Sequence, residues 1–225
     1  MASLLVRARL LYSLLRLCKR TRRKDRYPIM KGHRSRAALA VCSWLLSTAS
    51  LLEPCTIAVL SGRCTRDGRP LPWKNRDVAE QDNSVRFFSG RDRSFLGLCD
   101  LGDADAVFAG INSAGFAVLN SAAEDMEGAS GGGNGPFMKR ALEECATVED
   151  FEALLIATNQ PGRQTLANFG VIDARGGAAM FETGNTSYTR YDAAEAPSGF
   201  VVRTNFALTG IHPEYAGGYL RFDRA

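Results

Sequence analysis

The sequence EPCTIAVLSGRCTRDGRPLPWKNRD, residues 53–77, contains one complete β-hairpin pattern. The apolar run TIAVL, directly after Cys55, is typical of a short buried strand. Asp67-Gly68 lies in the turn that follows and is one of the strongest hairpin dipeptides, and Leu71 to Asn75 returns as the second strand. Because a hairpin brings its two ends together, we expect the charged residues at the end of this stretch to lie beside Cys55.

Outside this hairpin, apolar and alternating runs predict further strands, and two segments have a helical period. One helix is predicted to begin at Pro136 and to continue through residues 137–146. A second helix is predicted to be capped by Thr147, with Asp150 three positions later. Hairpins, then a helix pair, then hairpins again predict an antiparallel α+β layered fold and not βαβ units. The further strands are predicted at 84–88, 95–98, 107–111, 116–120, 168–173, 178–182, 187–191 and 199–206.

The composition indicates one folded domain with an acidic balance. The chain has 225 residues, of which 45% are hydrophobic, enough for a real core. Its formal charge of +4 comes from residues 1–36, which hold twelve Lys and Arg against one acidic residue. Residues 55–225 hold 16 basic and 22 acidic residues, which argues against a nucleic-acid surface. They also contain no run of about 20 apolar residues, so we expect no membrane span in the mature domain.

The first 54 residues have the pattern of an export signal. Residues 37–46 (AALAVCSWLL) are apolar and follow basic residues, and Ser47-Thr48-Ala49 resembles a signal-peptidase site. We therefore expect residues 1–29 to be a basic extension or a mis-called start, and residues 30–54 to be a signal peptide plus a short propeptide. Residues 55–225 would be the functional domain, exported to the periplasm or the extracellular space. The alternative is an N-terminal membrane anchor that is never cut.

Cys55 is the strongest candidate for a reactive residue because it stands at the junction of leader and domain. If the chain is cut before it, the thiol and the freed α-amine belong to one residue, and an amine with a pKa of about 8 can take the thiol proton. A separate histidine is then not required, and His212 is the only histidine after residue 54. Cys64, Cys99 and Cys145 have neither C-x-x-C spacing nor a nearby histidine, so no zinc site is indicated.

An ordered set of motifs runs from Cys55 to the last residue. They are CTIAV, DGRPLPWKNRD, GINSAGFAVLNS, GPFMKRALEECATVEDFEALL, FET, RTN and RFDRA, the last within GGYLRFDRA, which reads as the beginning of a helix. Together they resemble the cysteine-type N-terminal-nucleophile (Ntn) hydrolases: choloylglycine hydrolases, penicillin V acylases and isopenicillin-N acyltransferase-like amidases. The resemblance implies a four-layer αββα sandwich with two stacked antiparallel sheets. Chains of that family continue further, so we expect this sandwich to be incomplete at the C-terminus.

The resemblance assigns roles near the first hairpin. Cys55 matches the nucleophile, and Asp77 matches the residue that holds the α-amine over the thiol. Lys74 stands where bile-salt members carry arginine, although a lysine is a point charge and cannot form the planar fork. Arg76 is a neighbouring cation for part of that role, and a cation near a thiol lowers its pKa. From the residues alone, a buried strand cysteine, a turn-capping Asp77 and a solvated Lys74 stay open as alternatives.

Three further residues are assigned later in the chain. Asn120 matches an asparagine of the oxyanion hole, and Asn205 matches a second one that orients the substrate amide and supports the same hole. Arg221 matches a distal arginine near the nucleophile. Side-chain amides suit this chemistry because acyl transfer develops an oxyanion. From the residues alone, the two asparagines are also consistent with strand-end turns, and Arg221 with a solvated or structural position.

The resemblance implies hydrolysis of a linear amide C–N bond other than a peptide bond, through an acyl-thioester on Cys55. It implies a small-molecule N-acyl amide substrate and no metal or organic cofactor, leaves a homo-oligomer open, and implies maturation by autoproteolysis before Cys55. An N-acyltransferase that uses an amine in place of water is the near variant. The rival hypothesis, from another class, is a catalytically inactive truncated remnant or fragment of such an enzyme.

Overall fold

The computed structural model describes residues 55–77, 82–123, 125–129, 131–210 and 219–224. The predicted basic extension and export signal, residues 1–54, therefore lie outside the described residues. Within the described ranges, no helix is both long enough and apolar enough to cross a lipid bilayer.

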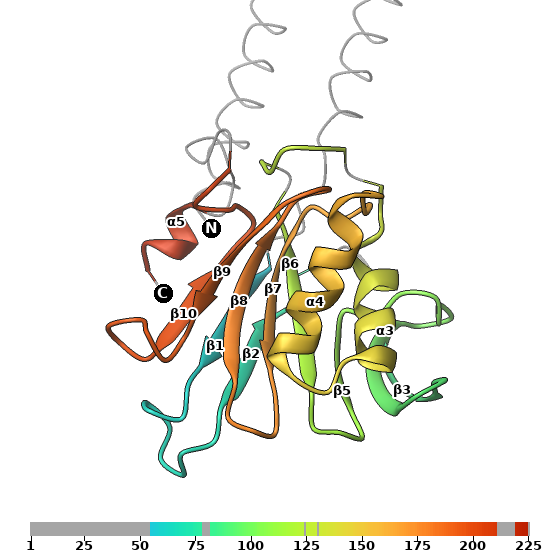
Figure 1. The fold of residues 1–225 in the computed structure, drawn as a ribbon, viewed down its shortest axis with the longest axis horizontal. Helices are drawn as coiled ribbons and strands as arrows, with labels where there is room; N and C mark the ends of the chain where they lie inside the picture. The colour runs from blue at the N-terminus through green and yellow to red at the C-terminus, as the bar shows by residue number, and fades with distance from the viewer. Residues whose placement is uncertain (1–54, 78–81, 124, 130, 211–218, 225) are drawn as a thin grey trace, which may run out of the picture. The chain divides into compact units, whose positions relative to one another are not determined.

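The hairpin predicted around Asp67-Gly68 forms part of a small antiparallel sheet (Figure 1). Strands β1 (Thr56–Leu60) and β2 (Leu71–Asn75) pair along their whole length. Gly68 in the connecting turn has a φ of +73°, which side chains with a Cβ rarely adopt. Strand β10 (Phe200–Arg203) pairs with the other side of β1, so β1 is the central strand and Cys55 precedes it directly.

A second antiparallel sheet has seven strands, each paired with the next one in the sequence (Figure 1). Helices α3 (Asn134–Glu144) and α4 (Val148–Asn159) are inserted between its fourth and fifth strands. The strands are β3 (Asn83–Ser89), β4 (Ser94–Asp100), β5 (Ala109–Asn112), β6 (Ala117–Ala122), β7 (Ala167–Ile172), β8 (Ala178–Thr183) and β9 (Tyr188–Asp192). Every predicted strand is present, but the predicted strand at 199–206 ends at Arg203 and does not continue to Phe206.

The two inserted helices begin where the sequence places their caps, with one difference. In α4 the Thr147 side chain accepts the Asp150 N–H while Asp150 accepts the Thr147 N–H, which is the predicted capping box. Helix α3 was predicted to begin at Pro136, but it begins two residues earlier, at Asn134. Pro136 is tolerated there because N–H groups in the first helical turn have no partner within the helix. A short helix α5 (Tyr219–Phe222) lies in the predicted C-terminal helical segment.

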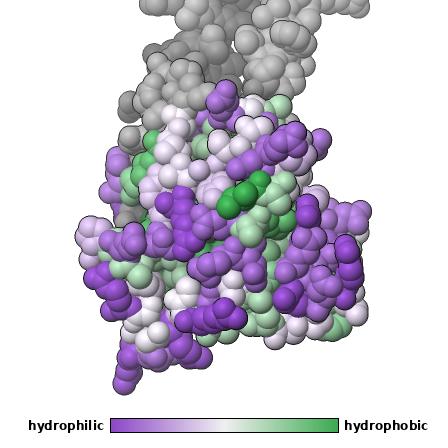
Figure 2. Space-filling model, viewed as in Figure 1, coloured by the Kyte–Doolittle hydropathy of each residue, from purple (hydrophilic) through white to green (hydrophobic). Residues whose placement is uncertain are grey.

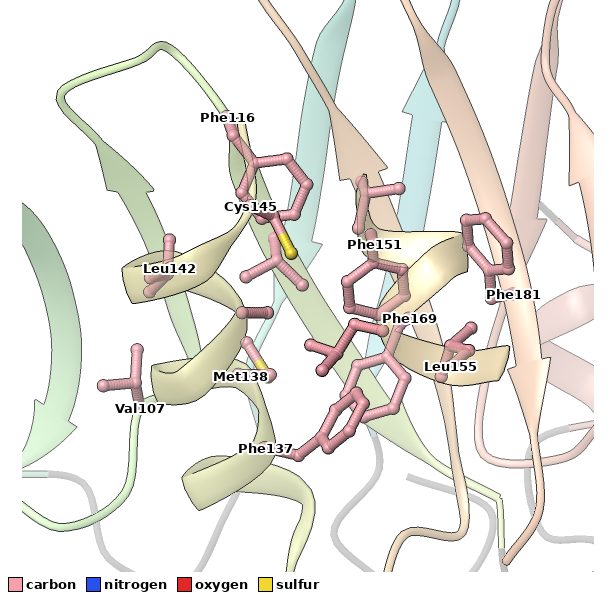
Figure 3. Close-up of a cluster of buried hydrophobic side chains, with 14 of the residues drawn as sticks. Val107, Phe116, Phe137, Met138, Leu142, Cys145, Phe151, Leu155, Phe169 and Phe181 are labelled. Carbon is pink, nitrogen blue, oxygen red and sulfur yellow. The ribbon is translucent and has the colours of Figure 1, made fainter. Parts of the chain in front are cut away.

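The larger hydrophobic core lies between the helix pair and the seven-stranded sheet (Figure 3). Phe151 of α4 is fully buried at its centre. Its ring lies 5.2–6.1 Å from the rings of four other phenylalanines, Phe116, Phe137, Phe169 and Phe181. Such ring pairs contribute about 0.5–1.5 kcal/mol each beyond the area they bury. Hydrophilic side chains predominate on the solvent side of the helices, the face seen in Figure 2.

A second core joins the two sheets face to face. Ile57 and Val59 of β1 pack there with Leu119 of β6 and Met180 of β8. The predicted α+β fold with two stacked antiparallel sheets is therefore confirmed. Helices α3 and α4 form the layer on the large sheet. Trp73 lies on the outer face of the small sheet and is 50% exposed. The residues that the structure describes therefore do not cover that face.

Candidate active site

Cys55 lies at the end of the small sheet, directly before the central strand. It is 6% exposed and carries a free thiol. Its backbone carbonyl accepts a hydrogen bond from Nη1 of Arg221. The backbone of Cys55 is therefore held by the start of β1 and by a residue far along the chain.

A cavity of about 210 Å³ lies beside Cys55. Four of the six predicted site residues line it: Cys55, Lys74, Asn120 and Asn205. They come from the start of β1, from β2, from β6 and from the segment after β10, so the fold brings together residues that are distant in the sequence. The rest of the lining is Arg76, Ala106, Phe108, Ser121, Ala122, Gly132, Asn134 and Gly135.

Lys74 connects the small sheet to the end of β6. It pairs with Ile57 in the β1–β2 register, which places it near Cys55. Its Nζ donates to the Asn120 carbonyl at 2.7 Å, to Oδ1 of Asn120 at 2.9 Å and to the Phe108 carbonyl at 2.9 Å. These acceptors match the three N–H donors of an ammonium group. Lys74 therefore anchors Asn120, a geometry that suits a point charge better than a planar guanidinium.

The contact with Lys74 also orients the Asn120 side chain. Because Oδ1 accepts from the ammonium group, Nδ2 is left as the donor end of the amide. Among the described residues, Nδ2 of Asn120 has no acceptor, and Asn120 lines the cavity with Cys55. An amide held in this way can donate to a charge that develops in the cavity.

Asn205 and Arg221 form a second connected pair. Nη2 of Arg221 donates to Oδ1 of Asn205 at 2.9 Å, and Nδ2 of Asn205 donates to the Ala122 carbonyl at 3.1 Å. Nη1 of Arg221 also reaches Oγ1 of Thr56 at 3.2 Å. Burial lowers the pKa of the Arg221 guanidinium, while the nearby Cys55 and Asp77 act in the opposite direction. Arg221 therefore links Asn205 to the residue that carries the thiol.

Asp77 is the exposed member of the predicted set. It follows β2 and is absent from the described lining of the cavity. Its charge raises the pKa of Arg221, so it lies within electrostatic reach of the Cys55–Arg221 contact. The partner expected for Asp77, the α-amine of Cys55, exists only after the bond before Cys55 is cut.

Residues outside the predicted set of six also line the cavity. Arg76 lines it, but its guanidinium pairs with Asp100 at 2.6 Å and lies 4.2 Å from the centre of the Phe108 ring. The charge that was a second candidate for the role of Lys74 is thus paired with a carboxylate. No sequence pattern identified Phe108, in the loop before β5, or Asn134, the first residue of α3, as cavity residues.

Comparison with known proteins places the chain in a family. The model of the family described as acyl-coenzyme A:6-aminopenicillanic acid acyl-transferase matches residues 64–220, which is more than half of the chain. No curated protein matches at the sequence level.

One solved structure supports the same fold, and a second is similar over a comparable part of this chain. The N-acylethanolamine-hydrolyzing acid amidase ortholog of Caenorhabditis elegans is similar with 18% identity and a TM-score of 0.52, over 68% of this chain and 70% of that chain. A mutant of the conjugated bile acid hydrolase of Clostridium perfringens has 17% identity and a TM-score of 0.48, over 69% of this chain and 54% of that chain. At 18% identity, the similarity to the Caenorhabditis elegans protein establishes the fold alone. With the family match over residues 64–220 and the two stacked sheets, the chain belongs to the acyl-coenzyme A:6-aminopenicillanic acid acyl-transferase family of Ntn hydrolases.

Proposed function

We propose that the protein hydrolyses the C–N bond of small N-acyl amides, with Cys55 as the nucleophile. The observation that carries this proposal is the convergence of Cys55, Lys74, Asn120 and Asn205 on one cavity in a member of an acyl-transferring Ntn family. The pairing of a thiol with oriented amide donors is what acyl transfer requires.

Maturation is the first step of the proposal. The peptide bond before Cys55 is cleaved by autoproteolysis, which releases the α-amine next to the thiol. Asp77 accepts a hydrogen bond from this amine and holds it in place. Because an α-amine has a pKa of about 8, it can take the thiol proton near neutral pH and later return it.

Catalysis then proceeds through a thioester. The Cys55 sulfur attacks the amide carbonyl carbon while its proton passes to the α-amine. The oxyanion accepts hydrogen bonds from Nδ2 of Asn120 and from the second N–H of Asn205. The C–N bond breaks, and the leaving amine takes the proton back from the α-amine. Water then attacks the thioester, which releases the acid and restores the thiol. The contact of Lys74 with Oδ1 of Asn120 supports this assignment because it leaves the amide nitrogen as donor.

The substrate class follows from the same chemistry. The similar protein of Caenorhabditis elegans is described as an N-acylethanolamine-hydrolyzing acid amidase, and an N-acylethanolamine is a small N-acyl amide. We therefore propose a linear N-acyl amide. Transfer of the acyl group to an amine in place of water is the second candidate, since the family model is described as an acyl-transferase.

The direct test is turnover of amide probes by the full-length protein. An N-acylethanolamine and a glycine-conjugated bile acid are incubated with the parent, and acid release is followed by mass spectrometry. Turnover of at least one probe is expected, with none in Cys55→Ala and full activity in Cys64→Ala, an exposed thiol outside the cavity. Addition of a primary amine tests transfer, because a new amide would then form. Turnover that persists in Cys55→Ala, or a parent without turnover of any probe, would contradict the proposal, and the latter would favour the inactive remnant.

Export is part of the proposal. Residues 30–54 would direct the chain to the periplasm or the extracellular space, where signal peptidase cuts after Ala49. Cell fractionation with an N-terminal sequence of the exported form tests this step. Protein that stays in the cytoplasm with residues 30–49 attached would contradict it.

A further inference from the structure

Three buried polar residues lie side by side on neighbouring strands of the large sheet. Ser121 of β6 pairs with Asn168 of β7, which in turn pairs with Glu182 of β8. They are 1%, 0% and 0% exposed. By the alternation of strand residues they share a sheet face with Leu119 and Met180, which belong to the core between the two sheets. We call Ser121, Asn168 and Glu182 the polar ladder.

Each member of the polar ladder binds the backbone of the segment after β10, residues 204–209. Oγ of Ser121 donates to the Thr204 carbonyl at 2.6 Å. Nδ2 of Asn168 faces the carbonyls of Thr204 and Phe206, at 3.0 and 2.9 Å. The polar ladder therefore replaces the strand pairing that ends at Arg203.

Glu182 holds the far end of the same segment. Oε1 accepts the Leu208 N–H at 2.9 Å, and Oε2 accepts the N–H and the hydroxyl of Thr209 at 3.0 and 2.6 Å. Nε of Arg203 donates to Oε1 at 2.6 Å, which fixes the residue where β10 ends. Burial alone would raise the pKa of Glu182, but the Thr209 hydroxyl, Arg203 and the backbone N–H groups together lower it, so the carboxylate stays charged.

Asn205 is the residue that this arrangement presents to the cavity. It lies between Thr204 and Phe206, whose carbonyls both face Asn168. Its side chain bonds to Ala122 and Arg221 and lines the cavity with Cys55. A shift of the segment would therefore move the Asn205 amide relative to the thiol.

The composition of the polar ladder is difficult to explain by stability alone. A buried ion pair such as Glu182–Arg203, with side chains 0% and 4% exposed, is often no more stabilising than apolar residues of the same volume. Oδ1 of Asn168 is buried and has no hydrogen-bond partner among the described residues, which is unfavourable. Both features are consistent with side chains that serve to fix one geometry of the 204–209 segment.

We propose that the polar ladder positions Asn205 for acyl transfer, so that it sets kcat through the 204–209 segment. This inference rests on the proposed function, in which Asn205 donates to the oxyanion. The members of the polar ladder are positioning residues. Asn168 and Glu182 act on the reaction through backbone atoms of the 204–209 segment and not by touching the substrate.

The test combines kinetics with hydrogen exchange on full-length variants. Glu182→Gln keeps the size of the side chain but places an NH₂ group against N–H donors, and Thr209→Val, at an exposed position, removes one hydroxyl donor without threatening the fold. We expect Glu182→Gln to lower kcat by about 10- to 100-fold with a much smaller change in KM, and Thr209→Val to act in the same direction more weakly. In an Asn205→Ala background, Glu182→Gln should lower kcat little further, because both substitutions remove the same contribution, the hydrogen bond from Asn205 to the oxyanion.

Asp173→Asn is the matched control. Asp173 is another buried carboxylate that accepts backbone N–H groups, those of Val148, Arg175 and Gly177, at the opposite end of β7. This variant should lower the melting temperature without lowering kcat. By mass spectrometry, amide exchange should rise in peptides covering residues 204–209 for Glu182→Gln but not for Asp173→Asn.

The outcomes separate this inference from the proposed function. Unchanged exchange at residues 204–209 in Glu182→Gln, or faster exchange with an unchanged kcat, would overturn the positioning role. A loss of kcat that is fully additive with Asn205→Ala would also overturn it. A parent without turnover would overturn the proposed function instead, and the exchange data would still decide whether the polar ladder holds the segment.

Discussion

Replacement of Lys74 by methionine tests how the site builds its oxyanion donor. The substitution keeps an unbranched side chain but removes the ammonium group that donates to the Phe108 carbonyl and to both oxygens of Asn120. Oδ1 of Asn120 then has no cation to hold it, and the amide can rotate away from the donor orientation.

The expected magnitude follows from these contacts. Loss of one oxyanion donor costs about 10²–10³ in kcat, or about 2.7–4 kcal/mol of activation free energy. The carbonyls released by Lys74 border the cavity, so water can reach them, and the cost in folding stability should be near the low end of about 1–3 kcal/mol. For a chain of this size that corresponds to a melting temperature lower by about 2–4 °C. Lys74→Met should therefore damage catalysis far more than folding.

The assay is steady-state kinetics on an amide probe together with thermal denaturation followed by circular dichroism. Arg69→Met is the control, since Arg69 lies in the first hairpin, its side chain is 83% exposed, and its ion-pair partner within the described ranges is the half-exposed Asp67. Such a surface pair contributes about 0–1 kcal/mol, and its loss should leave kcat unchanged. Lys74→Arg should fall between the parent and Lys74→Met, because a guanidinium restores donors in a different geometry. A parental kcat in Lys74→Met would refute the argument that Lys74 holds Asn120 for the reaction.

Three further predictions concern the folded domain. Burial raises the pKa of Cys145 to about 12, so iodoacetamide at neutral pH should leave Cys145 unlabelled in the folded protein while it labels exposed Cys64, and peptide mass mapping that finds labelled Cys145 without denaturant would contradict this. The pKa of Glu182 in the folded protein lies below its ordinary value of 4.5, because its hydrogen-bond donors and Arg203 outweigh the opposing effect of burial. Its stabilising effect is therefore present above pH 4.5 and lost as the pH falls below it, so the difference in melting temperature between the parent and Glu182→Gln should shrink in acid and should not grow. Phe151→Ala removes the ring at the centre of the larger core and should cost about 3–5 kcal/mol in urea denaturation, whereas a loss as small as that of a surface substitution would show that the core repacks.

The sequence predicts the local elements of this fold well because their signals are local. The Asp67-Gly68 turn, the apolar strand after Cys55 and the Thr147–Asp150 capping box each depend on residues a few positions apart, and all three are present. The strand predicted at 199–206 fails at its end for a physical reason. Residues 204–209 bind buried polar side chains of the large sheet in place of a neighbouring strand, and those partners lie far away in the sequence.

The candidate site could be predicted only in part from the sequence. The hairpin predicts only that Lys74 lies near Cys55, which was chosen for its position after the leader. The roles of Lys74, Asn120 and Asn205 were assigned through the family resemblance, and no spacing connects the two asparagines to Cys55. The anchoring of Asn120 by Lys74 spans 46 positions and depends on how the two sheets stack. Asn168 has the pattern of an ordinary strand residue, and Glu182 lies in the FET motif without an assigned role. The contacts of both with the segment after β10 could not be inferred from strand patterns.

The most direct test of the account is the intact mass of the purified protein before and after brief treatment with iodoacetamide and with an amide probe. If cleavage before Cys55 creates the catalyst, the purified chain begins at Cys55, iodoacetamide alkylates the Cys55 thiol faster than the exposed thiol of Cys64, and a transient acyl adduct forms that alkylation prevents. In Cys55→Ala the fast alkylation is lost and only the slower labelling of Cys64 remains. A chain that keeps residues 50–54, with Cys55 unreactive and no adduct, would contradict the claim that cleavage before this cysteine creates the catalyst.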